Sequence, residues 1–259
     1  MNITTLLDKV YFAPRLKKID FYANRAGELQ HRVLDRLVRM AENTEWGKKY
    51  DYKSIHTYED FRNRLPIQTY EEVKPYVERL RAGEQNLLWP SEIRWFAKSS
   101  GTTNDKSKFL PVSKEALNDT HYQGGKDAVA LYLGQNPDSR FFSGQGLILG
   151  GSHSPNLNSR HGLVGDLSAI LIQNIHPLVN CVRVPSKKIA LMSDFEKKIE
   201  AIANSTIPVN VTSLSGVPSW MLVLIKRVLE KTGKQTLEEV NMAQSGSLLP
   251  WWCCFHPLS

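Results

Sequence analysis

A run of hydroxyl side chains around a single glycine, followed by lysines, is the part of the sequence best suited to chemistry. Residues 98–108 read Lys-Ser-Ser-Gly-Thr-Thr-Asn-Asp-Lys-Ser-Lys. Gly101 allows the backbone to approach an oxyanion closely, and successive backbone amides can form a concave anion-binding site. The hydroxyl groups add hydrogen-bond donors, and Lys108 or Lys106 adds positive charge. These residue types in this order predict a loop that binds phosphate groups.

The same composition is also compatible with a polar surface hairpin, because Ser, Thr, Gly, Asn and Asp are common turn residues. Two familiar phosphate loops are excluded by the order of the residues. The Walker loop needs a Gly-Lys-Ser/Thr sequence that opens a helix, and no Gly-Lys pair occurs in this run. The dinucleotide pattern of three spaced glycines is also missing, since Gly101 is the only glycine there.

Ser-Ser-Gly-Thr-Thr, followed by Lys-Phe-Leu-Pro-Val-Ser, resembles the first nucleotide motif of adenylate-forming enzymes. In this form it resembles the Gretchen Hagen family, the auxin-responsive-promoter group of acyl acid–amido synthetases. Residues 44–50 resemble the family's early Thr-x-aromatic-Gly-Lys segment, and short segments between Asp60 and Glu84 follow in the family's order. Residues 210–220 resemble its bacterial members. The resemblance covers roughly Leu29 to Val240.

The resemblance implies a two-step reaction. A carboxylate attacks the α-phosphorus of Mg-ATP to give an acyl-adenylate and pyrophosphate, and an amino acid or amine then displaces AMP to form an amide. The motif implies that Lys108 and Thr102 are catalytic, with Lys108 neutralising the developing charge. It implies that the β- and γ-phosphates are held by Ser99, Ser100, Gly101, Thr102, Thr103 and Lys108.

The expected cofactors are therefore ATP and Mg²⁺, and the expected partners are a small carboxylic acid and an amino acid or amine. Two alternatives remain open from the sequence. One is a ligase that transfers the acyl group to a thiol such as coenzyme A. The other is a non-catalytic fragment that binds the nucleotide or the acyl group.

Other candidate residues carry weaker signals. His153 follows a buried strand and could line the acyl pocket, although a structural role is favoured. Ser213, Ser215 and Gly216 could form a second turn of small residues beside the site. His161 and His176 have no Cys, Asp or Glu at the spacing of metal ligands, so we expect no protein-bound metal site. Trp220 and Met221 are interpreted as helix core.

The elements that must position these residues mix helices and strands. Apolar spacing predicts an amphipathic helix over 28–42. Capping-box patterns at Thr57 and Thr69 predict two short helices, and Pro75 is expected to kink or interrupt the second. Strands are predicted at 93–96 and 109–112, on either side of the phosphate loop.

Further along, a helix is expected from Ser113 towards Leu133, and a buried strand at 146–150. A capping box at 193–196 and Pro218 predict two more helices, the second ending at Gly233. The fold class is mixed α/β (α+β), specifically the incomplete N-terminal part of the large domain of an adenylate-forming enzyme.

Residues 1–240 are expected to form that N-terminal part, and residues 241–259 an aberrant tail. The family's two later nucleotide motifs and its C-terminal domain do not occur in the sequence. Trp has a single codon, so Trp251 and Trp252 read one base later give Gly-Gly, and the shifted frame can match the family's continuation. We hypothesise a frameshift near Val240.

Composition excludes several other classes of protein. The net charge is +7, but basic and acidic residues are interleaved, which argues against nucleic-acid binding. The longest apolar run, residues 220–225, is much shorter than the roughly 20 residues of a membrane span. No signal peptide is recognised, so a cytoplasmic location is expected. The three cysteines fit neither a zinc site nor a disulfide framework.

Overall fold

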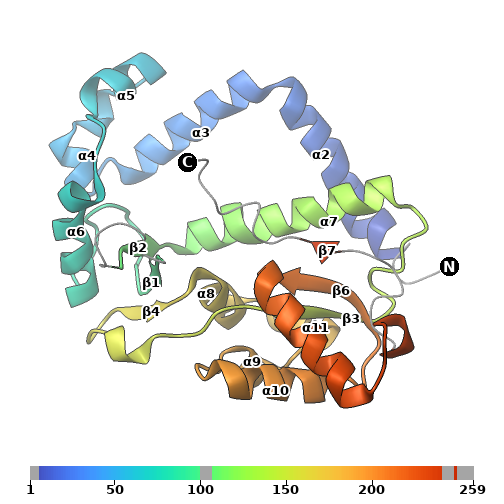
Figure 1. The fold of residues 1–259 in the computed structure, drawn as a ribbon. Coiled ribbons are helices and arrows are strands. Elements are labelled where there is room, and N and C mark those ends of the chain that lie inside the picture. The colour runs from blue at the N-terminus through green and yellow to red at the C-terminus, as the bar shows by residue number, and fades with distance from the viewer. Residues whose placement is uncertain (1–5, 100–106, 241–247, 250–259) are drawn as a thin grey trace. The chain divides into compact units, whose positions relative to one another are not determined.

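The computed structural model describes residues 6–99, 107–240 and 248–249. The chain divides into two compact units, each with its own sheet. The helices and strands are labelled in Figure 1. Unit 1 comprises Met1–Leu16, His121–His153 and Asp166–Ser259, and unit 2 comprises Lys17–Thr120 and Ser154–Gly165.

Unit 2 contains a small sheet with β1 at its centre. The strands are β1 (Trp95–Lys98), its antiparallel partner β2 (Phe109–Val112) and its parallel partner β4 (Leu163–Gly165). Phe96 is fully buried and shares a hydrophobic cluster with Val77 and Leu80. The predicted strand at 109–112 is confirmed. The predicted strand at 93–96 begins two residues later, and Ile93 packs in the same cluster from the preceding loop.

The N-terminal stretch of the chain is helical, and its starts follow the capping signals. Thr57 Oγ1 accepts a hydrogen bond from the Asp60 amide at 3.1 Å, and the Asp60 carboxylate accepts one from the Thr57 amide at 3.0 Å. Thr69 and Glu72 form the second capping box, so both predicted boxes are confirmed. The helices are α2 (Ala13–Asn24, which begins in unit 1), α3 (Ala26–Ala41), α4 (Glu45–Lys49), α5 (Tyr58–Arg64) and α6 (Tyr70–Ala82).

Pro75 lies inside α6, and the helix continues to Ala82 in spite of it. The expectation that Pro75 interrupts this helix is therefore wrong, and the alternative of a kink stays a prediction. A proline near the start of a helix removes one backbone hydrogen bond. The next turns are held by Val77 and Leu80, whose side chains are each only 1% exposed. Burial of these two side chains outweighs the local loss.

Helix α3 confirms the predicted amphipathic helix and shows which stripe is buried. Val38 and Ala41 are buried, whereas Val33 and Leu37 are 46% and 40% exposed. The sequence has two adjacent apolar stripes here, so periodicity alone could not distinguish the packed side from the exposed side. One consists of Leu29, Val33 and Leu37, and the other of Leu34, Val38 and Ala41.

Unit 1 is built on a parallel sheet of order β5-β3-β6-β7. Its strands are β3 (Gln145–Leu149), β5 (Arg183–Val184), β6 (Val211–Gly216) and β7 (Leu248–Leu249). β3 pairs with β5 on one side and with β6 on the other, with Leu147 opposite Leu214. The buried strand predicted at 146–150 is thereby confirmed as a central strand of this sheet.

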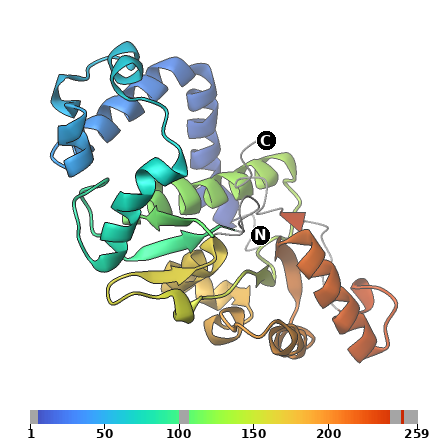
Figure 2. The same ribbon diagram turned by 60° about the vertical axis from the view of Figure 1, so that its left-hand side comes forward.

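Helices α10 and α11 lie side by side on one face of this sheet (Figure 1, Figure 2). Leu147 and Leu149 of β3 pack with Ile202 of α10 and Leu224 of α11 in one core, where all four are almost fully buried. The helices of unit 1 are α7 (Gln123–Gln135), α8 (Leu167–Asn174), α9 (Lys187–Ala190), α10 (Phe195–Thr206) and α11 (Pro218–Thr232).

The predicted boundaries of these helices need one correction. The N-cap of α10 is Asp194 and not Ser193, because the Asp194 carboxylate accepts the hydrogen bond from the Lys197 amide at 3.1 Å. The prediction for the other helix is confirmed: α11 begins at Pro218, and its C-cap is Gly233, which has a φ of +66°. The helix predicted from Ser113 is also found, with a π-helical stretch at Ala116–Tyr122 leading into α7.

The prediction of a mixed helix and strand fold is confirmed. The prediction for the tail stays a prediction, because most of 241–259 lies outside the described residues; Leu248–Leu249 pair with β6. No helix within 6–99 and 107–240 is both long and apolar enough to cross a membrane. A π-helical segment lies at Asp8–Phe12, and short 3₁₀-helical segments lie at Tyr52–Ser54, Pro155–Leu157, Pro177–Val182 and Glu238–Val240.

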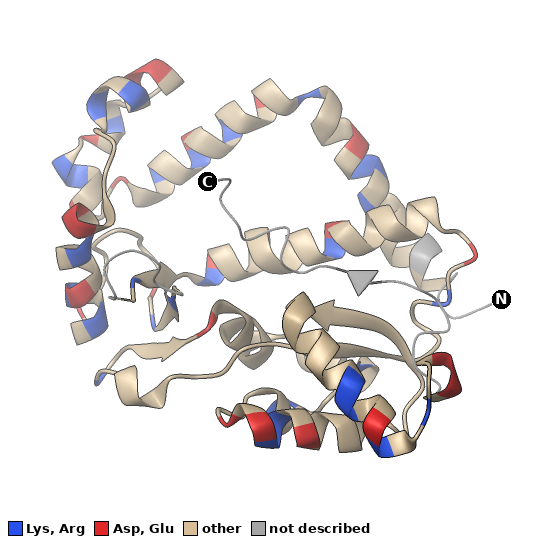
Figure 3. Cartoon of the chain, viewed as in Figure 1, with Lys and Arg blue, Asp and Glu red and all other residues tan. Residues whose placement is uncertain are grey.

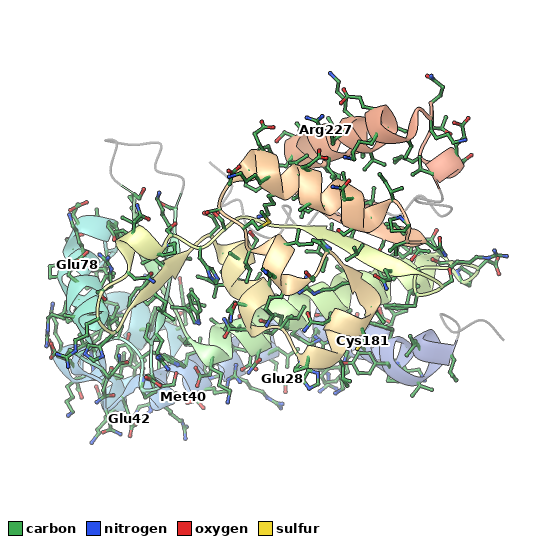
Figure 4. All side chains as sticks on the ribbon, turned by 90° about the horizontal axis from the view of Figure 1, so that it is seen from below. Glu28, Met40, Glu42, Glu78, Cys181 and Arg227 are labelled. Atoms are coloured by element: carbon green, nitrogen blue, oxygen red, sulfur yellow. The ribbon has the colours of Figure 1, made fainter. Side chains whose placement is uncertain are left out.

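Charged residues of both signs are interleaved along the helices, as expected from the sequence (Figure 3). Many of them pair within their own helix or with its neighbour. Arg227 of α11, labelled in Figure 4, lies 3.8 Å from Glu200 of α10, and Lys231 also pairs with Glu200. These exposed pairs contribute little stability, but they leave no continuous basic face on the seam between the two helices.

Candidate functional site

The predicted phosphate loop is closed at its base by a short antiparallel ladder. The Ser99 amide donates a hydrogen bond to the Lys108 carbonyl at 2.9 Å, and the Lys108 amide donates to Ser99 Oγ at 3.2 Å. The ladder continues through the Lys98–Phe109 pair of β1 and β2. Ser99 and Lys108, which flank residues 100–107 in the sequence, thus pair at the carboxyl end of β1, and parallel sheets usually present ligand-binding loops at this end.

Helix α6 fixes this base through Tyr70, its first residue. The Phe109 amide donates a hydrogen bond to Tyr70 Oη at 2.9 Å. The Lys108 ammonium lies 5.6 Å from the centre of the Tyr70 ring, within the range of a cation–π contact. Arg81, from the same helix, lies 4.0 Å above the Phe109 ring. Two cationic side chains therefore contact aromatic rings at the base of the hairpin.

Only part of the predicted site falls within the described residues. Ser99 and Lys108 are described and form the hairpin base. Lys108 is exposed and makes no ion pair with any residue in the described ranges, so its charge is available to an anionic ligand. The remaining predicted phosphate-binding residues lie outside the described residues: Ser100, Gly101, Thr102 and Thr103. Their roles stay predictions.

A second arrangement suited to ligand binding lies at the carboxyl edge of the sheet in unit 1. The chain passes from β3 to β5 on one side and then to β6 on the other, so its direction across the sheet reverses between β3 and β6. Ligands of open parallel sheets bind outside the strand ends at this switch point. Here the strand ends carry the turn 150–153 after β3, together with Ser215 and Gly216 of β6. The prediction that Ser213, Ser215 and Gly216 form a turn is therefore wrong, because all three pair with β3 as part of β6.

The turn 150–153 is held by side chains from α8 and α10. Lys198 Nζ donates hydrogen bonds to the carbonyl oxygens of Gly150 and Gly151, both at 2.7 Å. On the other side, the Gly151 amide donates to Ser168 Oγ and the Ser152 amide donates to Asp166 Oδ2, each at 2.8 Å. The backbone polar groups of the turn are therefore satisfied by the protein itself.

His153 ends this turn and is partly buried. Burial lowers the pKa of His153, and a hydrogen bond to the Ala169 backbone together with the Asp166 charge opposes that shift. A neutral imidazole at the carboxyl edge can accept or donate a hydrogen bond without adding charge. This suits a polar contact to an organic acid better than it suits a counter-ion.

The other residues singled out in the sequence have structural contacts. His176 Nδ1 accepts a hydrogen bond from the Leu178 amide and caps the turn that follows. His161 packs closely against Gly83. Met221 is buried in the core of unit 1, and Trp220 packs on the Phe195 ring at 5.7 Å. The described ranges contain no group of three His, Cys, Asp or Glu residues that could hold a metal ion.

Sequence reasoning missed Lys198, although a signal was present. Lys198 stands four residues before Ile202 on the inner stripe of α10, where an apolar residue is expected. Its side chain is only 3% exposed. A lysine at a core-facing helix position either lies close enough to the surface to reach water or has a specific buried partner, and here it has two carbonyl partners.

Comparison with known proteins gives the family. The GH3 family N-terminal domain matches residues 15–242, which is most of the chain. The chain belongs to the GH3 family. Among curated GH3 relatives, the indole-3-acetic acid-amido synthetase GH3.2 of Arabidopsis thaliana is 30% identical over 103 residues, which cover 39% of this chain and 19% of the relative. The jasmonoyl–L-amino acid synthetase JAR4 of Nicotiana attenuata is 26% identical over 106 residues, covering 40% of this chain and 18% of the relative.

Solved GH3 structures share the fold. The GH3.15 acyl acid amido synthetase superposes with a TM-score of 0.68 at 18% identity, covering 87% of this chain and 39% of that protein. A second structure of GH3.15, in complex with 2,4-DB, gives a TM-score of 0.65 at 20% identity, with coverage of 82% and 36%. The matched segments thus amount to about a fifth of the curated relatives' length and about two fifths of the solved chain.

Proposed function

We propose that this GH3 chain contributes the triphosphate-binding loop and part of the acid site of an enzyme that activates a carboxylic acid with ATP and joins it to an amino acid or amine. The observation that carries the proposal is the closed hairpin base. It joins Ser99 to Lys108, the two residues that flank the predicted loop, at the carboxyl end of β1. Amides and hydroxyls of a loop anchored in this way can act as preorganised donors to phosphate oxygens.

In this proposal the chain's own groups bind and neutralise the triphosphate. Lys108, which the Tyr70 ring contacts on one side, supplies positive charge for the β- and γ-phosphates. Ser100, Gly101, Thr102 and Thr103 supply donors from the loop. Mg²⁺ bound with the nucleotide would reduce the negative charge of the phosphates. The acid's own carboxylate is the nucleophile, so no side chain of the chain needs to attack the phosphorus.

The acid is assigned to the carboxyl edge of the sheet in unit 1, around His153 and Ser215. The names of the relatives specify indole-3-acetic acid and jasmonic acid derivatives, and the GH3.15 complex contains 2,4-DB. We therefore expect a small carboxylic acid with an apolar body as the substrate of this chain. A neutral histidine and small polar side chains at the strand ends would orient such an acid.

The test of the phosphate site is ATP binding by the 259-residue chain. Lys108→Ala is expected to weaken binding of Mg-ATP about tenfold, because a charge-assisted contact to phosphate is lost. Isothermal titration calorimetry measures this. Lys114→Ala is the matched control, since Lys114 is an exposed lysine at the opposite end of β2 and should leave the affinity unchanged. Equal affinities for the wild-type chain and Lys108→Ala would remove the proposed role of Lys108.

ATP–pyrophosphate exchange in the presence of candidate acids separates the alternatives. An acid-dependent exchange supports adenylate formation by the chain. ATP binding without exchange identifies it as a nucleotide-binding part of the enzyme. An amide product with an amino acid, as opposed to a thioester with coenzyme A, would identify the acceptor.

A further inference from the structure

Lys198 is a buried ammonium group whose hydrogen-bond partners are two adjacent carbonyls. Its side chain is 3% exposed, and Nζ lies 2.7 Å from both Gly150 O and Gly151 O. Burying a cation costs free energy unless it is paired and hydrogen-bonded. A leucine or methionine would fill a core-facing position on α10 at lower cost. The lysine at this position is therefore better explained by its hydrogen bonds to the two carbonyls than by its packing in the core.

The turn that Lys198 contacts is closely confined by neighbouring side chains. A Cβ at Gly151 would lie 2.1 Å from Asp166 Oδ2, so the backbone passes directly against this carboxylate. Asp166 and Ser168 accept hydrogen bonds from the amides of the turn on one side, and Lys198 donates hydrogen bonds to its carbonyls on the other. The three side chains together determine the course of the chain where it leaves β3.

The position of this turn connects it with function. It follows the central strand β3 at the switch point of the sheet, beside the end of β6. A shift of about 1 Å in groups that contact a ligand can cost orders of magnitude in rate. The ammonium of Lys198 does not reach the surface, so its effect on a ligand must act through the turn.

We propose that Lys198 is a positioning residue of the acid site: its ammonium group holds the carbonyls of Gly150 and Gly151 and thereby fixes residues 150–153 at the carboxyl edge of the sheet. The assignment of the turn to an acid site rests on the proposed function. The hold on the turn follows from the contacts of Lys198 alone.

The charges around Lys198 determine when this hold is strong. Burial lowers the pKa of Lys198 to about 8, and the Asp166 charge at the start of α8 opposes the shift. Burial lowers the pKa of His153 in the turn, and the Lys198 charge lowers it further. Acidic groups on α10 and α11 are Glu196, Glu200 and Glu230. Other cationic groups on the elements that contact α10 are Arg183 of β5, Lys187 and Lys188 of α9, and Lys226, Arg227 and Lys231 of α11.

Loss of the proton weakens the hold, because hydrogen bonds from an ionised donor are about twice as strong as those from a neutral one. The turn should therefore loosen as the pH rises through about 8. The free energy of unfolding of the whole chain should nevertheless rise with pH. The unfolded chain binds this proton with the ordinary pKa of 10.5, so this group makes the free energy of unfolding rise between about pH 8 and 10.5.

The experiment follows the two carbonyls directly. In the ¹³C,¹⁵N-labelled full chain, HNCO cross-peaks of the Gly151 and Ser152 amides report the ¹³C shifts of the Gly150 and Gly151 carbonyls. Both shifts should titrate with one midpoint near pH 8. Hydrogen-exchange protection of the same two amides, corrected for intrinsic rates, should fall about tenfold over this range. Carbonyl shifts that stay constant from pH 6.5 to 9.5 would overturn the proposal without any variant.

Substitutions of Lys198 provide a second test of the proposal. Lys198→Met should abolish the titration and give low protection at every pH, whereas Lys198→Arg should restore protection and move the midpoint out of the range. Lys197→Met is the matched control, because Lys197 is the adjacent lysine, with its side chain 77% exposed. A titration that persists in Lys198→Met, or that disappears in Lys197→Met, would contradict the assignment.

Acid binding distinguishes this proposal from the proposed function. Indole-3-acetate and 2,4-DB are titrated into the chain at pH 7 and pH 9 by calorimetry. Weaker binding at pH 9, absent in Lys198→Arg, supports the role in the acid site. If the carbonyls titrate as expected and neither acid binds, the assignment of these acids to the site fails while the hold of Lys198 on the turn stands. If an acid binds equally at both pH values, Lys198 does not position its site.

Discussion

Gly47→Ala is expected to lower the free energy of unfolding by about 3 kcal/mol, at the upper end of the cost of overpacking a core. The new Cβ would lie 2.1 Å from the carbonyl oxygen of Ala41. That oxygen cannot move aside easily, because Thr44 Oγ1 donates a hydrogen bond to it at 2.6 Å and also accepts one from the Gly47 amide at 2.9 Å. Thr44 is itself fully buried. Urea denaturation of the purified variant measures the change.

Gly27→Ala is the matched control for this substitution. Gly27 lies in α3, and a Cβ there would meet no atom within 4 Å. The same chemical change should therefore stabilise the chain by up to about 1 kcal/mol, the difference in helix propensity between Gly and Ala. If both variants change the free energy of unfolding by the same amount, close packing is not the reason for a glycine at position 47 of the Thr-x-aromatic-Gly-Lys segment.

Gly151→Ala is expected to disrupt the turn after β3 and to destabilise the chain by roughly 2–3 kcal/mol. The added methyl group would overlap Asp166 Oδ2 at 2.1 Å. The carboxylate must then rotate away, which breaks its hydrogen bond from the Ser152 amide and removes the anion nearest to Lys198. Acid binding at the carboxyl edge should be lost with it. Thermal unfolding and calorimetry with the acid measure the two effects.

The control within the same unit is Gly125→Ala, in α7, where a Cβ meets nothing within 4 Å. It should retain acid binding and gain slightly in stability. If the Gly151→Ala variant keeps its full acid affinity and stability, the turn can relax without affecting the site. The assigned role of the turn would then be wrong.

Local signals in the sequence predicted the elements well. The capping boxes at Thr57 and Thr69 and the strand 109–112 were correct because each depends on residues a few positions apart. The anchoring of the phosphate loop between two strands also followed from its flanking apolar segments. The first residue of α10 was displaced by one, because Ser193 and Asp194 are both good caps and only the backbone geometry distinguishes them.

Contacts between distant residues could not be predicted in this way. The order β5-β3-β6-β7 depends on how the chain crosses the sheet, and no short segment contains that information. The hold of Lys198 on Gly150 joins residues 48 positions apart. Tyr70 reaches Phe109 across 39 positions, so its role at the loop base was equally invisible. These contacts position the candidate sites, and they appear only in three dimensions.

Strand β4 comes much later in the sequence than its partner β1, and this order affects folding during synthesis. β1 and β2 are close in sequence and can form their hairpin early, but the parallel partner of β1, residues 163–165, comes much later in the chain. While the ribosome makes the intervening residues, one edge of β1 has no strand beside it. An open strand edge is a place where nascent chains associate wrongly. Between translation of Val112 and translation of Leu163, this edge of β1 is therefore open to pairing with the wrong strand.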